Sequence, residues 1–98
     1  MKRQETSGNR SREIESLVAR IKASFPGVIT EVEHFPSGAA MLDVRWLGRL
    51  FVLAYSPSGG FGVDEVKDDE GMEMGYRFRS ADYAEAVEEL FRLLRLAK

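Results

Sequence analysis

The sequence contains no cysteine and only one histidine, His34. Without cysteine the chain has no disulfide, no thiolate nucleophile and no cysteine-ligated metal. A single histidine cannot form a metal site built on two histidines. We therefore predict neither a metal nor a cofactor. The absence of cysteine also fits a reducing compartment, so we expect a cytoplasmic protein.

Long apolar runs are also missing. The longest, residues 50–55, has the length of a strand, whereas a membrane-spanning helix needs roughly 20 apolar residues. Residues 1–10 are polar and lack the apolar region of a secretory signal. We expect no membrane association and predict a disordered tail over residues 1–10. The net charge of −2 gives no general attraction to nucleic acid.

What is present is typical of one folded domain. Of the 98 residues, 44% are hydrophobic, which is enough to form a core, and we place the domain at residues 11–98. Apolar residues at helical spacing predict a first helix that begins near Ser11 and ends before Pro26. They also predict a last helix with Ser80 as its N-cap. In this last helix acidic residues come early and basic residues late, as the helix dipole favours.

Between the helices, β-branched and aromatic residues predict strands over 28–35, 39–47 and 49–55. Residues 61–66 are a candidate fourth strand, and residues 76–78 are a candidate short last strand. Two Pro-Ser-Gly turns separate these segments. The predicted fold class is α+β: a two-layer domain with both helices on one face of a three- or four-stranded antiparallel meander.

The register of the central strands depends on the turn near Gly48. With an even number of turn residues, the apolar residues of the two strands lie on one face of the sheet. A register shift of one residue would move the second strand's side chains to the opposite face. The predicted core face carries Ala40, Leu42, Val44, Trp46, Phe51, Leu53 and Tyr55. The opposite face carries Met41, Asp43, Arg45, Leu47, Leu50, Val52 and Ala54.

This opposite face is the first candidate interaction surface. Met41, Asp43, Arg45 and Val52 would form a half-apolar patch for a partner protein or for self-association. The alternative is a covered face with a local ion pair.

An acidic stretch within residues 61–75 is the second candidate. Its spacing departs from that of a calcium loop, because Val66 and Arg77 stand at the first and last ligand positions. It is either a solvated loop or a docking surface for a basic partner. The candidate residues are Asp64, Asp68, Asp69 and Glu70.

The glycine-rich segment 58–62 leads into strand-like, acidic residues, so we predict a hairpin loop rather than a phosphate cradle. The alternative function is nucleic-acid binding by a basic group at the last helix. Its arginines would contact phosphates, and neighbouring aromatic residues would stack on bases. Charge complementing the helix dipole is the competing explanation of the helical arginines. The candidates are Arg77, Arg79, Arg92 and Arg95.

The predicted order of helix, three strands and helix resembles the double-stranded-RNA-binding domain in topology. In that family a lysine-rich start of the last helix contacts phosphate, whereas residues 80–85 here read Ser-Ala-Asp-Tyr-Ala-Glu. We therefore carry over no function from that family. The sequence favours a small protein-interaction module, self-associating or inhibitor-like, with no enzymatic activity and no small-molecule ligand.

Overall fold

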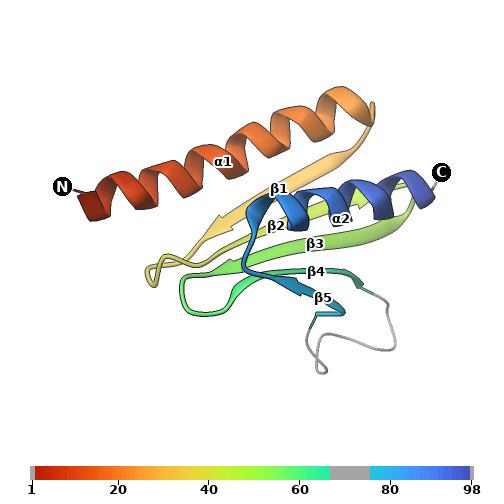
Figure 1. Cartoon of the computed structure of the whole chain (residues 1–98). Helices are drawn as coiled ribbons and strands as arrows, with labels where there is room; N and C mark the ends of the chain where they lie inside the picture. Colours follow the sequence, from red (N-terminus) through yellow and green to blue (C-terminus); the bar gives the residue numbers. More distant parts are fainter. Residues whose placement is uncertain (1, 67–75, 98) are drawn as a thin grey trace.

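The structure is a computed structural model. It describes the backbone of residues 2–66 and 76–97, and the side chains within these ranges from residue 12 onward. Two helices flank five strands in the chain (Figure 1). The elements are α1 (Lys2–Ser24), β1 (Ile29–His34), β2 (Ala40–Trp46), β3 (Arg49–Ser56), β4 (Gly60–Val66), β5 (Phe78–Ser80) and α2 (Tyr83–Leu96).

The five strands form one antiparallel sheet in the order β1-β2-β3-β4-β5. Both helices lie on the same face of this sheet (Figure 1). The predicted α+β fold is confirmed, with five strands in place of three or four. The candidate fourth strand is β4, and the candidate last strand is displaced by two residues to β5.

A two-residue turn fixes the register of β2 and β3. Leu47 and Gly48 have φ values of 55° and 77°, the positive values of a tight turn that matches the strand twist. Val44 therefore faces Phe51. The predicted core face is confirmed, because the turn has an even number of residues. Leu47 lies in this exposed turn rather than on the opposite sheet face.

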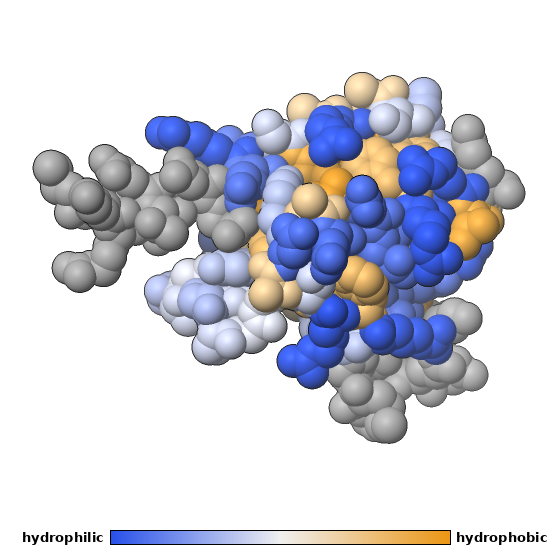
Figure 2. Space-filling view, viewed as in Figure 1, coloured by the Kyte–Doolittle hydropathy of each residue, from blue (hydrophilic) through white to orange (hydrophobic). Residues whose placement is uncertain are grey.

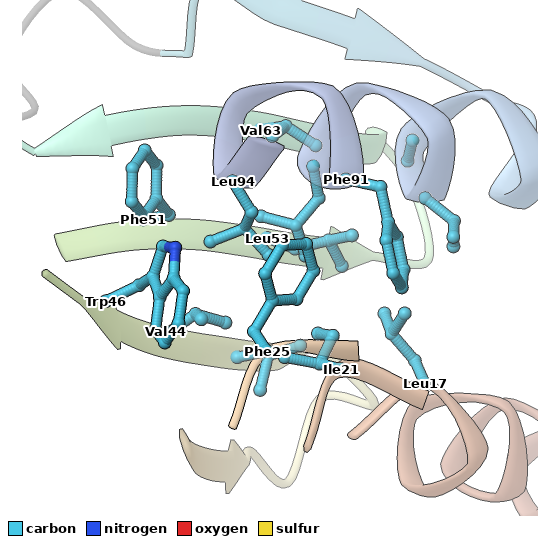
Figure 3. Packing of buried hydrophobic residues seen from close by; sticks show 14 of the residues in the cluster. Leu17, Ile21, Phe25, Val44, Trp46, Phe51, Leu53, Val63, Phe91 and Leu94 are labelled. Atoms are coloured by element: carbon cyan, nitrogen blue, oxygen red, sulfur yellow. The ribbon is translucent and has the colours of Figure 1, made fainter. Parts of the chain in front are cut away.

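The core lies between the helices and this face (Figure 3). The Phe25 ring, just after α1, lies 5.5 Å from the Trp46 ring and 5.8 Å from the Phe91 ring, measured between centroids. These three rings join the end of α1, β2 and α2 into one cluster. Other buried members are Leu17, Ile21, Leu42, Val44, Phe51, Leu53, Phe61, Val63, Ala86, Val87, Leu90 and Leu94.

The start of the first helix differs from the prediction. α1 begins at Lys2 rather than near Ser11, so the backbone of residues 2–10 is helical. Because no proline interrupts these residues, the helix anchored by buried Leu17 and Ile21 can extend through them; extension is easier than nucleation. Disorder of residues 1–10 in solution stays a prediction.

The start of the last helix differs as well. Asp82, not Ser80, is the N-cap of α2, and its side chain accepts a hydrogen bond from the Ala84 backbone N–H at 3.1 Å. Ser80 pairs with Phe61 as the last residue of β5. Both residue types are good N-caps. Pairing with β4 holds Ser80 in extended conformation, which moves the helix start two residues further along.

Candidate functional site

The sheet face away from the helices holds the first predicted patch. Arg45 is exposed there, and Met41 and Asp43 are half-buried, so these residues line the face as predicted. Val52 is only 4% exposed, so at this position the face is covered, which is the alternative that the sequence left open. The described part of this face is therefore divided into a covered middle and a more open end at β1 and β2.

Tyr76 covers the part of this face at Gly62. An added Cβ at Gly62 would lie 2.5 Å from Cδ2 of Tyr76, so the aromatic ring rests directly on this glycine of β4. Burial, followed by the charges of Asp43 and Asp64, raises the pKa of Tyr76 above its ordinary value. Val52 lies opposite Asp64 in the register of β3 and β4, on the same sheet face as Gly62.

Asp64 has a structural position in β4. It is 9% exposed and accepts hydrogen bonds from the backbone N–H groups of Glu65 at 2.8 Å and Arg77 at 3.3 Å. Its carboxylate also pairs with Arg77 Nε at 3.8 Å. These contacts tie the chain before β5 to β4. The other acidic candidates, Asp68, Asp69 and Glu70, lie outside the described residues.

The four candidate arginines are not brought together. Arg77 contacts Asp64, and Arg79 lies opposite Gly62 in the register, so both belong to the sheet side. Arg92 and Arg95 lie on α2, in the helical layer. Two hydrogen bonds of 2.6 and 2.9 Å join Arg92 to Glu89, and this contact raises the pKa of Arg92. The nucleic-acid hypothesis stays a prediction, and these four arginines do not form one basic surface.

The β1 edge is the feature that the sequence patterns did not single out. β1 pairs with β2 over all six of its residues, and it is the first strand of the sheet. Five of these six residues are exposed. Three of the five exposed large hydrophobic side chains among the described residues lie on or next to this strand: Ile29 (62% exposed), Val32 (37%) and Phe35 (39%).

Carboxylates follow one side of β1. Glu31 and Glu33 alternate along the strand and face Asp43 and Met41 of β2 in the register. A hollow of about 310 Å³ is lined by these four residues together with Val32. None of the three carboxylates makes an ion pair or hydrogen bond with another described side chain. The hollow is thus an acidic site directly beside an open strand edge.

A second hollow, of about 450 Å³, lies between α1 and α2. Its apolar lining residues Phe25, Val87 and Phe91 are each at most 8% exposed, and the Arg20 guanidinium already lies 5.1 Å from the centre of the Phe91 ring. It therefore offers little apolar surface to a ligand. Figure 2, in the view of Figure 1, shows a mainly hydrophilic surface with limited apolar areas.

No family model, curated protein or solved structure matches this chain. The function of this chain is therefore inferred from its own geometry. Among the described residues no group of three or more His, Asp or Glu side chains is arranged to hold a metal ion. No helix in this part of the chain is long and apolar enough to cross a membrane.

Proposed function

We propose that this chain is a small protein-interaction domain that binds an extended segment of a partner protein alongside β1. The observation that supports it is the exposed edge position of β1. An edge strand presents a row of backbone N–H and C=O groups without sheet partners. A segment added beside it satisfies these groups, and this mode of peptide recognition recurs in unrelated domains.

The two edges of the sheet are not equivalent. β1 has six residues, whereas β5 has three and is followed two residues later by the cap of α2. A six-residue edge offers room for several backbone hydrogen bonds to a partner, and a three-residue edge does not. Strand addition is therefore proposed at β1 alone.

Apolar side chains at this edge add a driving force. Covering on the order of 100 Å² of the apolar surface of Ile29, Val32 and Phe35 would contribute about 2–3 kcal/mol. Backbone pairing would orient the segment, and the side chains would select its sequence. The absence of catalysis and a cytoplasmic location both stay predictions.

A selection from a random peptide library against the full chain tests the proposal. Peptides that bind should shift the backbone amide resonances of β1 residues, with much smaller shifts in β5 and α2. Binding should also slow amide hydrogen exchange in both the peptide and β1, because both strands gain hydrogen bonds. Peptides that shift only the amide resonances of residues at the α1–α2 hollow, around Arg20 and Phe91, would overturn the proposal.

A further inference from the structure

We infer that the strand recognised at β1 carries lysine or arginine at alternate positions, so that two basic side chains meet Glu31 and Glu33. This inference rests on the proposed function and names the chemistry of its partner. Alternate residues of a strand point to the same side. Glu31 and Glu33 thus share one side of β1, and Asp43 lies opposite Glu31 on the neighbouring strand.

These three carboxylates have no basic counterpart among the described residues. Like charges directly opposite each other in a sheet, as at Glu31 and Asp43, are unfavourable. Arg45 lies on the same face but is paired in the register with Ile29, and it makes no ion pair with either carboxylate. A cation supplied by a partner would relieve this repulsion, so charge complementarity favours a basic segment.

The geometry also sets the spacing of the basic residues. In an added antiparallel strand, residues opposite Glu31 and Glu33 are two apart and project to the same side as the carboxylates. Met41 lines the same hollow and provides an apolar surface for the methylene stem of a lysine or arginine. The intervening partner residue faces Val32, so a β-branched apolar residue fits there.

A second copy of the chain fits this edge poorly. Consider two copies joined antiparallel at β1 with their helices on the same side, so that paired residues share a face. Two registers then pair more than three residues of Ile29–His34. In the first, Glu31 of one copy pairs with Glu31 of the other copy. In the second, Glu31 of each copy pairs with Glu33 of the other copy. Both registers therefore place carboxylate against carboxylate, which opposes self-association at this edge.

The test compares three synthetic peptides of equal length by calorimetric titration of the full chain. One alternates lysine and valine, one alternates glutamate and valine, and one contains the lysines and valines in two separate blocks. We expect the alternating lysine peptide to bind at least tenfold more tightly than the other two. Its affinity should fall as salt rises from low to physiological concentration, because the contact is electrostatic.

Variants of the chain locate the effect. The double variant Glu31→Gln/Glu33→Gln should weaken the lysine peptide about tenfold, the loss expected for two partly exposed ion pairs. Glu31→Lys/Glu33→Lys should reverse the preference toward the glutamate peptide. Glu15→Gln/Glu88→Gln, at exposed positions on α1 and α2, makes the same change in net charge outside β1 and should leave binding unchanged.

The outcomes separate the two proposals. If all three peptides bind with equal affinity and shift the β1 amides, the inferred chemistry is wrong and strand addition at β1 stands. If neither these peptides nor any library peptide shifts the β1 amides, both proposals fail. Equal weakening of the lysine peptide by Glu15→Gln/Glu88→Gln and by Glu31→Gln/Glu33→Gln would also overturn the inference, since it would show only a response to net charge.

Discussion

Replacing Gly62 by alanine is expected to dislodge Tyr76 from the sheet. The added Cβ would lie 2.5 Å from Cδ2, 2.6 Å from Cγ and 3.0 Å from Cβ of Tyr76, and real atoms do not approach so closely. The backbone of Gly62 is fixed by pairing with Ala54 on one side and Arg79 on the other. The tyrosine, rather than the strand, must therefore move.

The magnitude follows from the burial that the ring loses. Removing on the order of 100–150 Å² of aromatic contact costs about 2.5–4 kcal/mol as an upper bound. Alanine in a strand recovers about 0.5–1 kcal/mol relative to glycine. We expect Gly62→Ala to lower the free energy of unfolding by about 2 kcal/mol. In a domain of this size that is a fall in Tm of roughly 8–16 °C.

A double-mutant cycle read by thermal and urea unfolding tests this reasoning. In a Tyr76→Ala background most of the cost of Gly62→Ala should vanish, whereas in a Tyr76→Phe background it should persist, because phenylalanine keeps the ring. Gly59→Ala is the matched control in the neighbouring turn: its Cβ would lie 3.6 Å from Ser56 Oγ, an ordinary contact. Equal costs of Gly62→Ala with and without the ring would refute the account of the covered face.

Two further stability predictions follow from the same structure. The raised pKa of Tyr76 means that, above pH about 10, the phenol ionises first in the unfolded chain. The free energy of unfolding should then fall as pH rises past that value, and an unchanged slope in Tyr76→Phe would contradict this. Asp82→Ala should cost about 1 kcal/mol through loss of the α2 N-cap. Ser80→Ala should cost less in the same urea unfolding experiment, and the reverse order would restore Ser80 as the cap.

Much of the fold could be predicted from local patterns. The helical spacing of Leu17 and Ile21 places α1, and the alternation through Leu42 and Val44 defines the core face of β2. The two-residue turn at Gly48 then pairs β2 with β3 in the predicted register. These features depend on neighbours in sequence, so periodicity and turn chemistry are sufficient to identify them.

The remaining features depend on contacts between distant residues. Val52 is buried although its alternation assigns it to the outer face of the sheet. Tyr76, more than twenty residues later in the chain, lies over Gly62 on that same face. Ser80 and Asp82 are equally good caps by type, and only the pairing of Ser80 with Phe61 decides between them.

The candidate site was only partly predictable. The alternation of β2 predicts Met41, Asp43 and Arg45 on one face, and they line the sheet face away from the helices. The alternation of Glu31 and Glu33 in the strand 28–35 is visible in the sequence, but this pattern alone does not mark them as a candidate site. Their importance follows from the edge position of β1 and from the register that places Glu31 opposite Asp43.

Amide hydrogen exchange of the full chain, with and without the alternating lysine–valine peptide, tests strand addition at β1 most directly. Amides of Ile29–His34 that point away from β2 should exchange freely in the unbound chain and at least tenfold more slowly when the peptide is bound. Amides of β5 and α2 should keep their rates. The account would be contradicted if the amides of β1 kept their exchange rates at saturating peptide, or if only another element became protected.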